Sequence, residues 1–200
     1  MRTKYNKLIS FIQKNGGFTK YAELIRAGFY KAVIREAMKS GQIERIGRGV
    51  YSLANIPDTS HPDFVTVSVM IPNGVICLIT ALSFYEVTDE IPRYIDVAIP
   101  AGSKVRMIQK LPLRFHYFSR KTWEQGIEEH NIDGRKIQVY NLAKTLADCF
   151  KFRNQIGMNV ARSALKNALE QKKVNHRDIM KYASICRVTN ILKPILETLI

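Results

Sequence analysis

The sequence predicts an α+β protein in two parts, a small N-terminal domain and a larger mixed α/β domain whose C-terminal part is helical and basic. Three observations lead to this prediction. Short apolar repeats of helical period, each closed by glycine, occupy the N-terminal quarter of the chain. Helical and strand patterns mix in the middle, and the last third is helical throughout. With 200 residues and 46% hydrophobic composition, the chain is long enough to bury a substantial core.

The N-terminal part is expected to begin with three short helices. The first follows the apolar residues at positions 8–12 and ends at a pair of glycines. The second begins at Thr19, a residue type that caps helix N-termini, and stops at Gly28. The third covers residues 30–40, and Ile34 lies at the centre of its buried face.

Two short strands are predicted next, within residues 43–53. Arg48 lies between Gly47 and Gly49 at the turn that joins them, where glycine allows a positive φ angle. Three helices followed by a hairpin is the order of elements in a winged helix-turn-helix, a DNA-binding domain. We therefore expect a winged helix over residues 1–56.

A linker containing two prolines, residues 57–62, separates this domain from a second one expected over residues 63–200. A β-hairpin is predicted around Asp133-Gly134, because an Asp-Gly pair suits a type I′ turn. The segments predicted in this domain are helices at residues 64–71 and 75–85, strands at residues 94–99, 113–118, 127–132 and 135–140, and helices from residue 142 onward.

Positive charge is concentrated at the two ends of the chain, which has a formal net charge of +14. Residues 1–56 hold 11 basic and 3 acidic residues, giving +8, and residues 141–200 hold 11 basic and 4 acidic residues, giving +7. The middle segment, residues 57–140, holds 9 basic and 10 acidic residues, giving −1. Such fields attract polyanions, so nucleic acid is the first partner to test and an anionic membrane the second.

The cysteines and the lengths of the apolar stretches indicate the cellular compartment of the protein. Cys77, Cys149 and Cys186 lie far apart in apolar surroundings, which is typical of buried free thiols in a reducing environment. The apolar stretch near the N-terminus is too short for a signal peptide, and no run reaches transmembrane length. We expect a cytoplasmic protein with no membrane partner.

The third helix carries the residues expected to contact DNA bases. Lys31, Arg35 and Lys39 follow one another at intervals of four residues on its exposed flank. The planar fork of Arg35 suits the two acceptors of guanine, whereas Lys31 suits a phosphate. Arg48 is expected to enter the minor groove. The remaining expected DNA contacts are Thr19 and Lys20 at the start of the second helix and Arg45 in the hairpin. The alternative interpretation of the third helix is a solvated basic flank.

The sequence offers little for catalysis. The four histidines show no metal-like spacing, and Cys-x-x-Cys, nucleophile-elbow, phosphate-loop and dinucleotide motifs are absent. Asp96 with Lys104 downstream is only a partial nuclease pattern, since the second carboxylate is missing. We expect a protein that is not an enzyme, with no catalytic residues, no metal and no cofactor.

A longer motif lies at the start of the helical C-terminal part. Residues 137–154, IQVYNLAKTLADCFKFRN, resemble the C-terminal signature of AbiEi-type antitoxins, a family of abortive infection and phage defence. Residues 43–51 resemble the family's winged helix, and residues 74–78 and 126–130 resemble further parts in the same order. Tyr85 departs from the family pattern, in which histidine is expected.

The resemblance implies an antitoxin of a type IV toxin-antitoxin system that also represses transcription of its own operon. Its implied partners are operator duplex DNA, with inverted repeats in its own promoter, and a functionally paired nucleotidyltransferase-like toxin that need not form a stable complex with it. Two alternatives remain open. One is an antitoxin that acts by direct, stable binding to its toxin, and the other is a nucleic-acid-modifying enzyme, which would require a metal dependence that these residues do not suggest.

The signature segment also has a physical interpretation. Its apolar residues form the buried stripe of a helix, while Lys144 and Asp148 are spaced for an i, i+4 ion pair on the surface. We expect a second basic surface that contacts DNA beside the operator or an anionic target of the toxin such as tRNA; a solvated face is the alternative. Its expected members are Lys144, Lys151, Arg153, Arg162 and Lys166.

Overall fold

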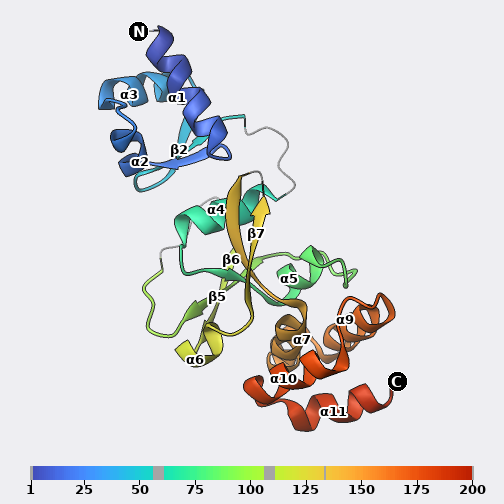
Figure 1. Cartoon of the computed structure of the whole chain (residues 1–200). Helices are drawn as coiled ribbons and strands as arrows, with labels where there is room; N and C mark the ends of the chain where they lie inside the picture. Colours follow the sequence, from blue (N-terminus) through green and yellow to red (C-terminus); the bar gives the residue numbers. More distant parts are fainter. Residues whose placement is uncertain (1, 56–60, 106–110, 133, 200) are drawn as a thin grey trace. The chain divides into compact units, whose positions relative to one another are not determined.

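The computed structural model of the chain describes residues 2–55, 61–105, 111–132 and 134–199 (Figure 1). It is a mixed α+β protein in which helices lead into sheets. It divides into two compact units. The first unit comprises residues 1–73, 105–111 and 129–137, and the second comprises residues 74–104, 112–128 and 138–200.

The first unit opens with three helices and a three-stranded sheet. The helices are α1 (Arg2–Lys14), α2 (Tyr21–Arg26) and α3 (Lys31–Lys39), and the strands are β1 (Phe18–Lys20), β2 (Ile43–Gly47) and β3 (Val50–Leu53). The strands pair antiparallel in the order β1-β3-β2. Leu8, Ile12, Leu24 and Ile34 pack together with Tyr51 in the core. The helix α4 (Pro62–Met70) also belongs to this unit.

Strand β1 is an element that the sequence did not predict. The backbone N–H of Gly17 donates to the carbonyl of Ile12 at 2.9 Å and ends α1, with a positive φ of 80° that glycine accepts readily. The chain then enters β1, where Thr19 lies opposite Tyr51. The prediction of Thr19 as a helix cap is therefore wrong. Helix α2 begins two residues later, and its first turn is capped from within by Glu23, whose carboxylate accepts the N–H of Lys20 at 2.9 Å.

A five-stranded sheet of order β6-β5-β4-β8-β7 forms the centre of the rest of the chain. Its strands are β4 (Val75–Ile76), β5 (Ile95–Pro100), β6 (Leu113–Phe118), β7 (Ile127–Ile132) and β8 (Arg135–Tyr140). β4 pairs antiparallel with β5 and parallel with β8. The predicted helix over residues 75–85 is thus wrong at its start, because β-branched Val75 and Ile76 fill the middle of the sheet and α5 begins only at Leu78.

The second unit contains several helices, most of which gather around α7 (Figure 1). The helices of this unit are α5 (Leu78–Phe84), α6 (Arg120–Trp123), α7 (Leu142–Lys151), α8 (Arg153–Ile156), α9 (Met158–Glu170), α10 (His176–Cys186) and α11 (Thr189–Glu197). α7 contacts α5, α8, α9, α10 and α11, whereas α6 contacts β5. Every residue from Leu142 to Phe150 is buried, so this helix has no solvent face over most of its length.

The tip of the β7-β8 hairpin belongs to the first unit, whereas its base belongs to the second. Arg135 at the tip donates from its guanidinium to the backbone carbonyls of Asn15 and Phe18, which frame the turn between α1 and β1. Partial burial lowers the pKa of Arg135 from its ordinary value. A residue more than a hundred positions downstream therefore satisfies two carbonyls of the N-terminal helix and strand.

Three further predictions concern the cysteines, the loops and membrane spans. Cys77, Cys149 and Cys186 are free and buried, as predicted. Asp133 of the hairpin turn and residues 56–60, which hold most of the expected linker and the domain boundary at residue 56, lie outside the described residues. Over the part of the chain that the structure describes, no helix combines the length and the apolar character needed to cross a bilayer.

Candidate nucleic-acid interface

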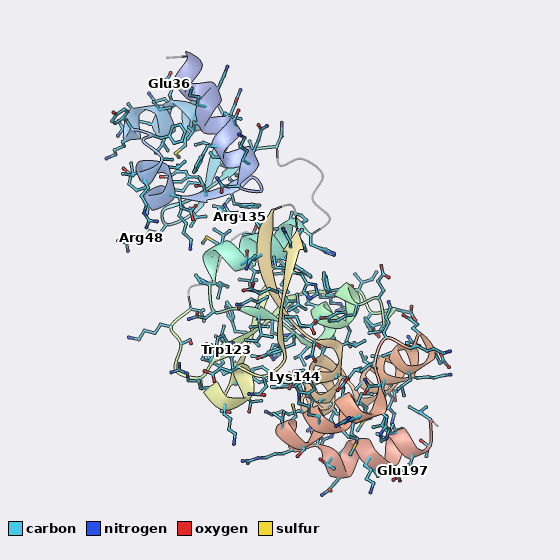
Figure 2. The ribbon with its side chains drawn as sticks, viewed as in Figure 1. Glu36, Arg48, Trp123, Arg135, Lys144 and Glu197 are labelled. Carbon is cyan, nitrogen blue, oxygen red and sulfur yellow. The ribbon has the colours of Figure 1, made fainter. Side chains whose placement is uncertain are left out.

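Helix α3 carries a row of cations on the side opposite its buried face. Ile34 and Ala37 are 3% and 0% exposed and pack into the core of the first unit. At 100° per residue, Arg35 projects in nearly the opposite direction from Ala37, and Lys31 and Lys39 lie one turn before and after it. All three side chains are exposed, as the prediction requires. Glu36, which is labelled in Figure 2, is exposed on the adjoining flank and limits the cationic row on that side.

The turn between β2 and β3 presents a second arginine. Gly49 adopts a φ of 71°, and its carbonyl accepts the N–H of Tyr21 at 2.7 Å, which attaches the turn to the first residue of α2. Arg48 is exposed at the margin of the N-terminal helices and sheet (Figure 2). Arg45 is also exposed, and its Nε donates to the carbonyl of Gly47 at 3.0 Å. The turn is thus fixed at its glycine and leaves the Arg48 side chain in solvent.

Two of the expected contact residues lie in β1, and they differ in exposure. Lys20 is half-buried and pairs with Val50 beside the turn, so strand pairing brings it near Arg48. Thr19 is 0% exposed, and its hydroxyl donates to the Glu23 carboxylate at 3.1 Å. Thr19 therefore has no surface with which to contact DNA, and that part of the prediction is wrong. It holds the start of α2 instead.

Sequence reasoning missed two exposed tyrosines beside these cations. Tyr21 is 36% exposed at the first position of α2, and Tyr30 is 65% exposed immediately before α3. Tyrosine hydroxyls are common donors to phosphate oxygens, particularly near helix N-termini. The signal was present in the sequence, because each tyrosine adjoins a lysine at a helix start, Lys20-Tyr21 and Tyr30-Lys31.

The expected second basic surface loses one of its members. Lys144 is 0% exposed, and its Nζ pairs with Oδ2 of Asp148 inside the second unit. The ammonium also lies 4.1 Å from the ring centroid of Tyr140 and 4.8 Å from that of Phe118. The predicted surface position of Lys144 and the predicted surface ion pair are both wrong, since α7 is enclosed on all sides.

The carboxylate of Asp148 in this buried pair has a second partner. Sγ of Cys186 donates to Oδ1 of Asp148 at 3.2 Å, which joins α10 to α7. Burial, with the charge of Asp148 adding to it, raises the pKa of Cys186 to about 12. The thiol therefore remains protonated and able to donate. Two hydrogen bonds thus satisfy a charge placed in an apolar helix bundle.

The other expected members of the second basic surface are accessible to different degrees. Lys151 is exposed, and its ammonium lies 5.4 Å from the ring centroid of Phe118. Arg153 is half-buried and donates to the carbonyl of Phe150 at 3.0 Å. Arg162 and Lys166 are exposed one turn apart on α9, with the Lys166 ammonium 3.7 Å from Glu170. Three exposed cations remain from the predicted five.

A comparison with known families finds a match over the N-terminal interface. Residues 6–54 match the model of a family described as transcriptional regulator, AbiEi antitoxin. The match covers α1 to β3 and confirms the resemblance found in the sequence. The matched segment is about a quarter of the chain.

A solved structure is similar to nearly the whole chain. The RV2827C protein from Mycobacterium tuberculosis matches 91% of this chain and 71% of its own length with a TM-score of 0.59. The sequence identity is 10%, so this likeness shows the fold alone. No curated protein matches the sequence.

The partial nuclease pattern at Asp96 has a structural explanation. Asp96 is 0% exposed and accepts from Nε and Nη2 of Arg114 at 2.6 and 3.1 Å and from Nε2 of His116 at 2.8 Å. Arg114 and His116 lie on β6 and Asp96 on β5, so these bonds fasten one strand to the next. The described residues contain no group of three or more His, Cys, Asp or Glu side chains able to hold a metal ion.

Proposed function

We propose that this protein is an antitoxin that represses its own operon by binding operator DNA through a winged helix formed by α1 to β3. The observation that carries the proposal is the exposed row of Lys31, Arg35 and Lys39 on α3, inside the segment that matches the AbiEi regulator family. The order of elements supports it, because three helices and a sheet of order β1-β3-β2 leave α3 with one uncovered face and end in an exposed hairpin turn.

In this proposal, α3 lies in the major groove of the operator. Arg35, opposite the buried face, donates both arms of its guanidinium to O6 and N7 of a guanine. Lys31 and Lys39, one turn away on each side, neutralise phosphates on the two strands that border the groove. Arg48 at the hairpin turn enters the neighbouring minor groove, where a narrow groove concentrates negative potential. The Lys20 side chain binds a phosphate of the DNA backbone.

In this proposal, the antitoxin acts against a nucleotidyltransferase-like toxin encoded beside this protein. The operator that it represses is made of inverted repeats. The family match supports an antitoxin, and the signature at residues 137–154 supports the AbiEi type. We assign protection to the second unit, where Lys151, Arg162 and Lys166 provide exposed charge for an anionic target. The rival is neutralisation by stable binding to the toxin, which co-purification of the two proteins would reveal.

A mobility-shift titration with the duplex upstream of the protein's own gene tests the DNA-binding part. Arg35→Ala and Arg48→Ala are expected to cost about 1 to 3 kcal/mol each in operator affinity, and Arg35→Ala also relaxes base preference. Arg120→Ala is the matched control, because Arg120 is an exposed arginine of the second unit with its own partner, Glu124. Operator binding by the Arg35→Ala, Arg48→Ala double variant at wild-type strength would refute the placement of the interface.

A co-expression assay with the neighbouring gene tests the antitoxin part separately. The same double variant, supplied from a foreign promoter, is expected to protect cells from the toxin while losing repression. This result would place the two activities in different units. Loss of protection together with repression, in a variant whose circular dichroism is unchanged, would contradict that division.

A further inference from the structure

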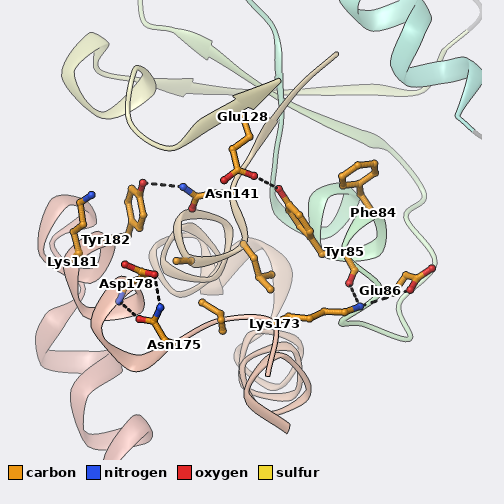
Figure 3. A pocket seen from close by; sticks show the side chains of 13 residues that line it. Phe84, Tyr85, Glu86, Glu128, Asn141, Lys173, Asn175, Asp178, Lys181 and Tyr182 are labelled. Carbon is orange, nitrogen blue, oxygen red and sulfur yellow. Dashed lines mark hydrogen bonds and ion pairs between the residues drawn. The ribbon is translucent and has the colours of Figure 1, made fainter. Parts of the chain in front are cut away.

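A pocket of about 730 Å³ opens in the second unit, away from the cations discussed so far (Figure 3). The end of α5, the start of β7, the first turn of α7 and the loop and first turns of α10 form its walls. This volume lies within the range of small-ligand and peptide-anchor pockets. All of the lining residues belong to one unit, so the pocket is defined by that unit alone.

Two tyrosines, Tyr85 and Tyr182, lie in this pocket on opposite sides of Asn141 (Figure 3). The hydroxyl of Tyr85 donates to the carboxylate of Glu128 at 3.2 Å on one wall. On the other wall, Nδ2 of Asn141 donates to the hydroxyl of Tyr182 at 2.8 Å, while Oδ1 of Asn141 caps α7 by accepting the N–H of Lys144 at 2.9 Å. Both rings are therefore held in place before any ligand binds, which lowers the entropy cost of binding.

The charges that line the pocket oppose the charge of the whole protein. Three carboxylates and two ammonium groups line it, a balance of −1 within a chain of +14. Glu86 and Lys173 largely compensate one another, with 3.7 Å between their charged atoms, and Lys173 also donates to the carbonyl of Tyr85 at 2.7 Å. A polyanion that binds the basic surfaces has no reason to enter here.

Two further carboxylates lie on opposite sides of the pocket. Glu128 accepts from the Tyr85 hydroxyl, and Asp178 accepts from Nδ2 of Asn175 at 2.6 Å. The remaining cation, Lys181, places its ammonium 5.4 Å from the ring centroid of Tyr182. The pocket thus offers acceptors and aromatic faces together.

We propose that this pocket binds an arginine side chain presented by a segment of a partner protein. A guanidinium is planar, donates in a fork to a carboxylate and stacks on a tyrosine ring, which matches carboxylates beside two preformed rings. The volume exceeds that of one arginine side chain and leaves room for flanking residues of the segment. Arginine and tyrosine are also the residues that most often anchor protein interfaces. The proposal rests on the second unit alone and holds whether or not the DNA-binding proposal does.

The test uses the full-length protein and an acetylated, amidated Ala-Arg-Ala tripeptide, followed by amide chemical shifts in heteronuclear NMR. The tripeptide is expected to move the signals of Tyr85, Asn141 and Tyr182, with a dissociation constant on the order of 1 to 10 mM. The same peptide with citrulline, which keeps the shape and removes the charge, is expected to bind at least about tenfold more weakly. A lysine peptide is expected to bind more weakly than the arginine peptide, because it lacks the planar fork.

Variants on both sides of the pocket provide the second measurement. The double variant Glu128→Gln, Asp178→Asn is expected to bind the arginine peptide at least about tenfold more weakly than the wild type. Folding is preserved, because Gln still accepts from Tyr85 and the bond that caps α10 uses the backbone N–H of residue 178. Glu90→Gln, an exposed position absent from the pocket lining, is the control and leaves binding unchanged. The proposal would be overturned if the citrulline peptide bound as tightly as the arginine peptide, or if the shifts were confined to another surface. Tighter binding of AMP, an anionic probe, in the pocket would also overturn it.

Discussion

Helices α3 and α7 each carry charged residues four positions apart, yet they place them in opposite environments. Arg35 lies four residues after Lys31 on α3, and both are exposed. Asp148 lies four residues after Lys144 on α7, and both are 0% exposed. The difference comes from the neighbours of each helix. α3 packs on one side only, whereas α7 is in contact with five other helices.

This comparison shows what an i, i+4 pattern can and cannot establish. The spacing shows that two side chains share a face, but it does not show whether water or protein covers that face. Four of the nine residues of α3 are charged and five are apolar. Three of the ten residues of α7 are charged and six are apolar, yet every residue from Leu142 to Phe150 is buried. The elements packed against each helix, rather than its spacing or composition, separate the two cases.

The buried pair on α7 is where we expect the largest effect. Asp148→Ala leaves the Lys144 ammonium without its counter-charge in the core and is expected to lower the free energy of unfolding by about 3 to 5 kcal/mol. Replacing both residues, Lys144→Met with Asp148→Leu, is expected to be nearly neutral or stabilising. Urea denaturation followed by fluorescence of Trp123, the single tryptophan, reports on the second unit.

An exposed pair on α9 is the matched control for the buried one. Glu170→Ala removes a partner of Lys166, whose ammonium lies 3.7 Å from it in solvent, and is expected to cost less than about 0.5 kcal/mol. If Asp148→Ala were as mild as Glu170→Ala, the two environments would not differ in the way that burial indicates.

The exposed cations of the first unit are expected to show their role in the salt dependence of operator binding. Lys31, Arg35, Lys39, Arg45 and Arg48 are all exposed. If the interface as a whole neutralises about five phosphates, the slope of log K against log salt is near −4.5, and affinity falls about 500-fold between 50 and 200 mM salt. Fluorescence anisotropy with a labelled operator measures this slope. A slope near zero would rule out duplex DNA as the ligand of these side chains.

The hairpin tip is expected to give an intermediate effect. Arg135→Ala leaves the carbonyls of Asn15 and Phe18 without their donor and is expected to lower the local stability of the first unit by about 1 to 3 kcal/mol. Native-state hydrogen exchange at α1 and β1 measures it, with the amides of α7 as an internal reference. Lys136→Ala, at the adjacent exposed position, should leave the protection of α1 unchanged. Equal protection in both variants would show that Arg135 contributes nothing to this turn.

The exposed cations of the second unit are expected to matter least for folding. Lys151→Glu, Arg162→Glu and Lys166→Glu together should change stability by less than about 1 kcal/mol, since all three positions are in solvent. The same variant is expected to protect cells from the toxin less well while binding the operator as before. If the folded variant protected cells fully, these three residues would be solvent-exposed charges with no role in protection.

Much of the fold followed from the sequence because local patterns and tertiary structure agree there. The β7-β8 hairpin and the helices of the last third form where alternation and helical period placed them. β1 and β4 were missed because they have only three and two residues and are defined by their partners in the sheets. A strand that short has no period of its own, so pattern reasoning assigned Thr19 to a helix cap and Val75 to a helix start.

The candidate sites were predictable to different degrees for the same reason. The α3 row comes from one helix, and its period was enough to group Lys31, Arg35 and Lys39. The pocket draws Tyr85, Glu128, Asn141 and Tyr182 from α5, β7, the start of α7 and α10, and nothing in the local sequence connects them. Lys144 was misplaced because its burial depends on helices that arrive later in the chain.

The β7-β8 hairpin also has a consequence for how this chain can be divided. Because its tip is counted with the N-terminal helices and its base with the second unit, the first unit is assembled from separate stretches of chain. No single cleavage or stop codon releases a complete first unit, and a fragment ending at residue 56 would lack α4 and the guanidinium that closes the α1-β1 turn. A gene fusion that transplants only the DNA-binding part would therefore need the hairpin tip supplied in trans or grafted by a new loop.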